Sequence, residues 1–201
     1  MTQNNIRIAI TGGIGSGKSA VCKIIEEYGL PVFSCDEIYS DLISDIGFLK
    51  VLEKEFGSIL NKDYTLNKKA LADKVFNDAV LRSKLNEITH PIIMDRAFKI
   101  MLEFRISFLE VPLLFEGGFE GMFDDVIVVL REKEDRINSV VTRDKIERER
   151  VVKRINSQIS YENYDFAKYY VIHNNEKISD LKRKVTEILK NLEIRFNEKF
   201  L

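Results

Sequence analysis

Residues 12–19 read Gly-Gly-Ile-Gly-Ser-Gly-Lys-Ser and match the pattern G-x-x-x-x-G-K-[ST]. An apolar run at residues 6–11 precedes the pattern, and a helical pattern that begins at Ala20 follows it. Glycines let successive backbone N–H groups approach phosphate oxygens, and the positive end of the following helix points at the same anion. In such a loop the lysine reaches the terminal phosphates and the serine hydroxyl ligates Mg²⁺. The stretch therefore predicts a strand, a phosphate-binding loop and a helix that bind a nucleoside triphosphate with Mg²⁺.

Further apolar runs along the chain are typical of buried strands, because they are short and bounded by turn residues or charge. Stretches of helical period lie between them, which favours an α/β fold with a parallel sheet. The C-terminal stretch 176–201 carries apolar residues at helical spacing and predicts a helix packed on the sheet. The expected strands are 6–11, 32–34, 107–111, 126–130 and 169–172, and the apolar residues of the tail are Ile178, Leu181, Val185, Ile188, Leu189 and Leu192.

Two regions interrupt the alternation of strands and helices. Residues 36–89 contain no convincing strand and are too long for one crossover, so we expect an inserted helical subdomain at 33–90. Residues 133–164 are shorter and dense in charge. Both a solvated helix pair with ion pairs along its surface and a mobile basic lid fit this second region. The expected core then consists of residues 1–32, 91–132 and 165–201.

The composition excludes several classes of protein. The 201 residues include 31 Lys+Arg against 32 Asp+Glu, so the net charge of −1 gives no footprint for general nucleic-acid or membrane binding. The chain has neither a basic, apolar leader nor an apolar span of roughly 20 residues, so we expect a cytoplasmic protein. Its two cysteines, Cys22 and Cys35, form no CxxC pair and are interpreted as buried, reduced thiols.

The loop motif leaves open which acceptor receives the phosphoryl group. A GTPase is expected to carry an Asn-Lys-x-Asp element, and the Asn-Lys stretches at residues 61–64 and 67–70 both lack the final Asp. A short core with two insertions suits an acceptor-binding subdomain and a lid, which favours a small-molecule kinase. A regulatory protein that hydrolyses nucleotide slowly and binds a protein partner is the alternative from a different class.

Motifs in a fixed order along nearly the whole chain resemble the dephospho-coenzyme A kinase family. The resemblance implies a P-loop nucleotide kinase core with three layers and a parallel five-stranded sheet, a helical acceptor-binding insertion and a small helical lid. It implies transfer of the γ-phosphoryl of ATP to the ribose 3′-hydroxyl of dephospho-CoA, the last step of coenzyme A biosynthesis. Another small-metabolite or nucleoside-monophosphate kinase is the alternative. Beyond residues 10–19, the motifs are Gly29-Leu-Pro-Val32 with Asp36, Leu85-Asn-Glu-Ile-Thr-His-Pro-Ile92, Val111-Pro-Leu-Leu-Phe-Glu116, Arg143-Asp144 through Arg154 to Gln158, and Val171-Ile-His-Asn174.

Three residues are expected to take part in the chemistry. Asp36 follows the second expected strand, at the sheet edge where α/β sites form, and a helix N-cap is the alternative role for its carboxylate. With the resemblance, Asp36 is expected to orient and deprotonate the 3′-hydroxyl. Lys18 and Arg143 are expected to stabilise the charge on the transferred phosphoryl group, Arg143 from the lid, with Arg154 as the second candidate.

Other side chains are assigned to binding. Glu110 and Glu116 flank the third expected strand, where an outer-sphere Mg²⁺ role for Glu110 and a structural pairing both remain open. His90 precedes Pro91, which suits the first turn of a helix, and the resemblance implies that His90 lies near the acceptor. Asn174 follows the last strand, where reading adenine and a turn role are both open.

The expected binding sets follow from these assignments. ATP is expected to bind Gly12, Gly13, Ile14, Gly15, Ser16, Gly17, Lys18, Ser19, Ala20, Arg143 and Asn174. Dephospho-CoA is expected to bind Asp36, Lys68, His90 and Glu116, and Mg²⁺ is expected at Ser19. The chain departs from the usual family pattern at Ala20, Ser34, Tyr64, Lys68, Ser139 and Lys168. ATP and dephospho-CoA are the expected partners, with no nucleic acid, membrane or obligate protein partner.

Overall fold

The computed structural model describes residues 5–76, 78–199 and 201 and divides into two compact units. The first unit, Met1–Phe33 with Met101–Leu201, holds the sheet and the helices around it. The second unit, Ser34–Ile100, is mostly helical. The second unit ends at Ile100 rather than at residue 90, because one helix runs without a break through that position.

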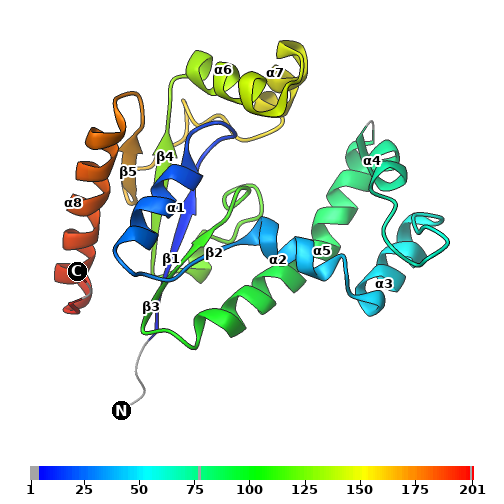
Figure 1. Cartoon of the computed structure of the whole chain (residues 1–201), viewed down its shortest axis with the longest axis horizontal. Coiled ribbons are helices and arrows are strands. Elements are labelled where there is room, and N and C mark those ends of the chain that lie inside the picture. Colours follow the sequence, from blue (N-terminus) through cyan, green and yellow to red (C-terminus); the bar gives the residue numbers. More distant parts are fainter. Residues whose placement is uncertain (1–4, 77, 200) are drawn as a thin grey trace. The chain divides into compact units, whose positions relative to one another are not determined.

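A parallel sheet of five strands forms the first unit, as expected from the apolar runs (Figure 1). The strand order is β2-β3-β1-β4-β5, so β1 lies between β3 and β4. Every strand lies within one residue of its expected bounds. The strands are β1 (Ile6–Thr11), β2 (Val32–Ser34), β3 (Ile106–Glu110), β4 (Asp125–Leu130) and β5 (Tyr170–His173).

The register brings the carboxyl ends of the central strands to one edge. Ile10 of β1 pairs with Glu110 of β3, and Thr11 of β1 pairs with Val128 of β4. From β1 the chain crosses to β2, beyond β3, and it later crosses from β3 to β4 on the other side of β1. Open α/β sheets bind ligands outside the carboxyl ends of their strands where the direction of the connections reverses in this way. The loop that follows β1 therefore occupies the ligand-binding edge of the sheet.

Two helices share an apolar core with the strands. α1 (Lys18–Glu27) and α8 (Ile178–Phe196) contribute Val21, Ile25 and Leu189 to the same buried cluster as residues of β1, β3, β4 and β5. The expected C-terminal helix on the sheet is confirmed. Its expected apolar stripe is wrong at Ile178, which is 66% exposed because it is the first residue of α8 and precedes the turn that meets the core.

The charged region consists of a helix pair, α6 (Lys133–Asp144) and α7 (Arg148–Asn156). Apolar side chains from both helices form a small cluster of their own, and the side chain of Ile14 packs against it. Charged pairs such as Glu134–Arg148 lie on the exposed side of the pair. A helix pair is confirmed here, whereas its motion as a lid stays a prediction. The buried members of the cluster are Ile137, Val140, Val151 and Ile155.

The helices of the second unit bury the apolar stripes expected from the sequence. Leu49, Leu52 and Phe56 are buried on one helix and Leu71 on the next. The expectation that Pro91 begins a helix is wrong, because Pro91 lies inside α5. A proline in a helix interior costs about 3 kcal/mol, and burial of neighbouring residues such as Met94 offsets that cost. The helices are α2 (Cys35–Leu42), α3 (Ile46–Phe56), α4 (Lys68–Phe76) and α5 (Ala79–Met101), and a short 3₁₀ turn, η1 (Glu120–Met122), belongs to the first unit.

Cys22 and Cys35 are both buried, and neither takes part in a disulfide in the part of the chain that the structure describes. Across residues 5–76, 78–199 and 201, no helix combines the length and the apolarity that crossing a bilayer requires.

Candidate active site

The loop between β1 and α1 has a shape that side chains would prevent. Gly12 and Gly17 have φ angles of 149° and 97°, which residues with a Cβ rarely adopt. A Cβ on Gly12 would lie 2.2 Å from the carbonyl oxygen of Val129, so the loop lies directly against β4. Gly17 is also the N-cap of α1 and has no side-chain cap, so the first N–H groups of α1 face the loop without an intrahelical acceptor. This arrangement is a cradle for an anion.

Lys18 supplies a buried positive charge to this cradle. Its side chain is 9% exposed, and Nζ donates to the carbonyl oxygens of Gly12 at 2.8 Å and Gly13 at 3.5 Å. Ser16 is 1% exposed, and its Oγ has no hydrogen-bond partner among the described residues. A buried ammonium and a buried hydroxyl in a glycine cradle fit the oxygens of a bound phosphate.

Asn174 holds the loop from the end of β5. Its Nδ2 donates to the carbonyl oxygen of Ser16 at 2.8 Å, and a Cβ on Gly17 would lie 2.2 Å from the same nitrogen. The structure thus places Asn174 on the loop backbone, which makes its side-chain nitrogen a support for the phosphate cradle. Reading of adenine by Asn174 stays a prediction.

Arg136 was not among the expected site residues, although it contacts the loop. Its side chain is 3% exposed, and Nε donates to the carbonyl oxygen of Ile14 at 3.0 Å. The guanidinium lies 6.0 Å from the ring centre of Tyr161 and 3.4 Å from a carboxylate oxygen of Glu162. Burial lowers the pKa of Arg136 from its usual value, and the neighbouring Glu162 acts against that shift. A sequence signal exists, since Arg136 lies four residues before Val140 and so shares a face of α6 with that buried residue.

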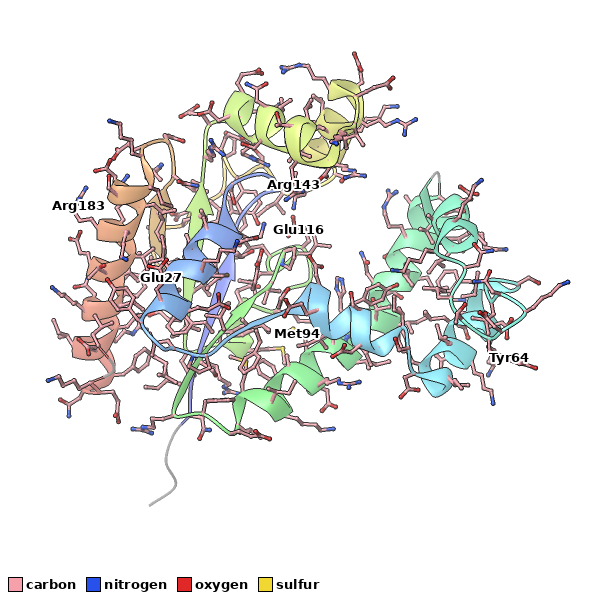
Figure 2. All side chains as sticks on the ribbon, viewed as in Figure 1. Glu27, Tyr64, Met94, Glu116, Arg143 and Arg183 are labelled. Atoms are coloured by element: carbon pink, nitrogen blue, oxygen red, sulfur yellow. The ribbon has the colours of Figure 1, made fainter. Side chains whose placement is uncertain are left out.

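Arg143 lies at the C-terminal end of α6 and is exposed (Figure 2). Its Nε and Nη2 donate to the carboxylate of Asp144 at 2.7 and 3.2 Å, and Arg154 Nη1 lies 3.4 Å from the same carboxylate. These hydrogen bonds raise the pKa of Arg143 and lower that of Asp144. The negative charge of Glu110 contributes to the same shift of the Arg143 pKa, after the effects of Asp144. Both arginines expected in the lid are therefore held by one carboxylate.

The two glutamates that flank β3 have different surroundings. The Sγ of Cys22 on α1 donates to Oε2 of Glu110 at 3.6 Å, and burial, followed by the charge of Glu110, raises the pKa of the Cys22 thiol. Glu116, which is labelled in Figure 2, accepts a hydrogen bond from the backbone N–H of Ile159 at 3.0 Å. Glu116 therefore supports the chain that follows α7, and its expected role in acceptor binding stays a prediction.

The other residues expected to meet the acceptor belong to the second unit. Asp36 lies exposed in the first turn of α2, and its backbone N–H donates to Ser34 Oγ at 3.2 Å. The alternative role of Asp36 as an N-cap is wrong, because Ser34 occupies that position with its hydroxyl as the acceptor. Lys68 begins α4 and is exposed. His90 is half-buried within α5, and burial lowers its pKa.

A cavity of about 240 Å³ opens beside the phosphate cradle in the first unit. Gly13 and Ser16 of the loop, the buried Arg136 and Tyr161, and His173 at the end of β5 belong to its lining. Burial raises the pKa of Tyr161 to about 12, so its hydroxyl stays protonated at neutral pH. The cavity combines a cation, an aromatic ring and polar groups, which suits part of a nucleotide.

The donor set near the loop fits Mg²⁺ bound mainly through a nucleotide. Ser19 lies exposed in the first turn of α1, and Glu110 ends β3 next to β1. Mg²⁺ keeps several waters and takes one or two protein ligands together with phosphate oxygens. Within the described residues no cluster of three or more His, Cys, Asp or Glu side chains could hold a metal by itself. One hydroxyl and one nearby carboxylate agree with a metal that arrives with its nucleotide.

Comparisons of the sequence with known proteins identify one family. The family model of dephospho-CoA kinase matches residues 6–180, a range that includes the whole second unit. A dephospho-CoA kinase of Fusobacterium nucleatum is 36% identical over 181 residues, which cover 89% of this chain and 94% of that protein. A dephospho-CoA kinase of Helicobacter pylori is 33% identical over 192 residues, which cover 92% and 96%.

Solved structures with the same fold agree with this result. The Thermus thermophilus protein TT1252 matches with a TM-score of 0.81 and 30% identity, over 94% of this chain and 98% of that chain. Dephospho-CoA kinase from Campylobacter jejuni matches with a TM-score of 0.66 and 26% identity, over 92% and 96%. The similarity therefore extends over sequence and fold together.

Proposed function

The chain belongs to the dephospho-CoA kinase family, and on that premise we propose which of its residues carry out the reaction. It is an ATP-dependent transferase that phosphorylates dephospho-CoA to CoA, the last step of coenzyme A biosynthesis. The family assignment replaces the two alternatives that the motifs left open, another small-molecule kinase and a regulatory nucleotide-binding protein. A cytoplasmic location and the absence of an obligate protein partner stay predictions from the sequence.

ATP binds with its phosphates in the loop of residues 12–19, and the observation that carries this assignment is the glycine cradle around Lys18. The ammonium of Lys18 exchanges the carbonyl oxygens of Gly12 and Gly13 for β- and γ-phosphate oxygens, because an anionic acceptor binds it more strongly. The ribose and base extend into the neighbouring cavity, where Arg136 and Tyr161 offer a cation and a ring.

Mg²⁺ would be held by the Ser19 hydroxyl, with Glu110 in its outer sphere. When bound, the ion neutralises charge on the β- and γ-phosphate oxygens. Cys22 donates to Glu110 Oε2 and so occupies one oxygen of that carboxylate. The thiol keeps its proton at neutral pH, because burial raises its pKa.

The transfer step needs a base and a charge clamp. The carboxylate of Asp36 accepts the proton of the ribose 3′-hydroxyl as the oxygen bonds to the γ-phosphorus. The bond between that phosphorus and the bridging oxygen breaks, and ADP leaves with the electron pair. Arg143 stabilises the charge on the equatorial oxygens, and its raised pKa keeps it protonated throughout. Lys68, His90 and Glu116 contact the acceptor in this proposal.

One assay tests the proposal directly. The purified chain is incubated with ATP, Mg²⁺ and dephospho-CoA, and formation of CoA is followed by mass while ADP release is coupled to a spectroscopic signal. Adenosine, AMP, CMP and shikimate serve as competing acceptors. We expect turnover with dephospho-CoA only, and loss of nearly all of it in Lys18→Ala. ADP release without an acceptor would contradict the proposal.

A further inference from the structure

The tip of the phosphate-binding loop is attached to a segment far along the chain. The backbone N–H of Ile14 donates to Oε1 of Gln158 at 2.7 Å, across 144 residues of sequence. The donor is an N–H group, so the acceptor atom of the Gln158 amide has to be its oxygen. Gln158 comes two residues after the end of α7 and is half-buried.

The other groups of Ile14 are held by the same part of the fold. Its carbonyl oxygen accepts from Arg136 Nε at 3.0 Å, and its side chain packs against the apolar cluster between α6 and α7. The next residue, Gly15, leaves no room for a Cβ, which would lie 2.5 Å from the carbonyl oxygen of Arg136. The N–H, the carbonyl oxygen and the side chain of Ile14 thus all contact α6, α7 or the chain after α7.

The chain after α7, residues 157–162, is itself fixed at several points. The N–H of Ile159 donates to Glu116 at 3.0 Å, on the loop that follows β3. Tyr161 is 5% exposed, and Glu162 lies 3.4 Å from the guanidinium of Arg136. On the other side, the backbone N–H of Gln158 donates to the carbonyl oxygen of Ile155 in the last turn of α7 at 3.1 Å. Gln158 therefore projects from a segment that is held both before and after it.

We propose that Gln158 is a positioning residue for nucleotide binding, because its amide oxygen fixes the Ile14 peptide and so holds the loop in its phosphate-binding shape before ATP arrives. A loop that is already ordered loses less conformational freedom when it binds its ligand, and this increases affinity. The ground state and the transition state gain equally from such ordering, so it acts on the KM for ATP and leaves kcat unchanged. The inference rests on the proposed phosphate site.

The experiment uses Gln158→Met, which keeps the length of the side chain and removes the oxygen. Hydrogen exchange of the Ile14 amide is measured by NMR without nucleotide, and steady-state kinetics are measured with ATP and dephospho-CoA. One hydrogen bond corresponds to a factor of about three to ten. We expect exchange of the Ile14 amide to accelerate by about that factor, and the KM for ATP to rise by about the same factor. The kcat and the KM for dephospho-CoA should change less than about twofold.

Two further variants serve as controls. Gln158→Glu keeps an oxygen acceptor, so slow exchange of the Ile14 amide should return. Ser157→Ala removes only the local hydrogen bond from Ser157 Oγ to the carbonyl oxygen of Arg154, on the same turn, and should match the wild type in exchange and kinetics. The wild type alone also tests whether the loop is ordered before ATP binds, because its Ile14 amide should then exchange slowly in the absence of nucleotide.

The proposal is overturned if the Ile14 amide of the wild type exchanges at the rate of an open chain, or if Gln158→Met leaves that rate unchanged. It is equally overturned if kcat falls while the KM for ATP stays the same, which would indicate a role in the transition state. Failure of the phosphate site is distinguishable, because Lys18→Ala would then keep its turnover whatever the exchange of Ile14 shows.

Discussion

The positive charges beside the phosphate-binding loop are buried to very different degrees. Lys18 and Arg136 are 9% and 3% exposed, whereas Arg143 is 64% exposed. A buried charge needs several hydrogen bonds to offset its lost hydration, and loop carbonyl oxygens accept from both buried cations. Lys18 and Arg136 thus form part of the loop itself. Arg143, whose hydrogen bonds among the described residues go to the carboxylate of Asp144, can change partners when substrate arrives.

Replacement of Arg143 tests whether this exposed arginine acts differently from the two buried cations. Arg143→Ala should lower kcat by about tenfold or more and raise the KM for ATP much less, because the exposed guanidinium acts in the transition state. Steady-state kinetics with varied ATP measure both quantities. Arg150→Ala is the matched control, since Arg150 is a 68% exposed arginine on the neighbouring helix, 3.9 Å from Glu147. A rise in the KM for ATP with kcat unchanged would instead make Arg143 a ground-state clamp.

A conservative replacement of Asp36 tests its assignment as the base. Asp36→Asn should lower kcat by about 10²-fold, because the amide cannot accept the proton of the 3′-hydroxyl. The melting temperature should stay close to the wild-type value, because Ser34 rather than Asp36 caps α2. Kinetics and thermal unfolding are measured on the same preparations.

The neighbouring carboxylate supplies the control for Asp36. Glu37→Gln removes a charge from the same first turn of α2 and should keep nearly full activity. Activity of Asp36→Asn within about threefold of the wild type would refute the assignment of Asp36 as the base.

Among the elements, α5 departs most from what the sequence predicts, because Pro91 was expected to lie in the first turn of a helix. It runs from Ala79 to Met101, and His90 lies one residue before the proline in its middle. Burial lowers the pKa of His90 below its usual 6.5, so the neutral form is favoured in the folded chain. The stability gained from this is complete above pH 6.5 and is lost as the pH falls through the lowered pKa.

The pH dependence of unfolding tests this environment. Between about pH 7.5 and 5.5, the melting temperature of the wild type should fall further than that of His90→Gln, which has no imidazole to protonate. Thermal unfolding in buffers of matched ionic strength measures the difference. His173→Gln, which replaces the exposed histidine at the end of β5, should keep the wild-type slope. Identical slopes for all three proteins would show that protonation of His90 is not linked to folding.

At the scale of the whole molecule, our proposal assigns ATP to the first unit and most of the acceptor contacts to the second. The phosphate cradle, the cavity beside it and the α6–α7 pair belong to the first unit, and Asp36, Lys68 and His90 belong to the second. The reaction therefore needs groups from both units, although each unit has its own buried core.

Hydrogen exchange followed by mass spectrometry tests this separation. A non-hydrolysable ATP analogue should protect peptides that contain residues 12–20, and CoA should protect peptides within Ser34–Ile100. Each ligand is added alone and then together with the other. Protection by CoA that is confined to the first unit would contradict the assignment of the second unit to the acceptor.

The sequence by itself determined the sheet, the loop and the family. Apolar period, glycine spacing and motif order are local properties, so all five strands and the position of the phosphate-binding loop could be predicted to within a residue. The catalytic assignments of Asp36 and Arg143 also came from sequence, and they stay predictions.

Only the tertiary structure decided which side chains hold the loop. Arg136, Gln158 and Asn174 reach it across 122, 144 and 158 residues of sequence. Helical spacing shows which face of its own helix a residue occupies, but not which distant loop meets that face when the chain packs. The same limit applies at Pro91, where burial on both sides of the residue carries α5 through a position that local propensity marks as a start. Long-range packing, rather than local pattern, completes the site.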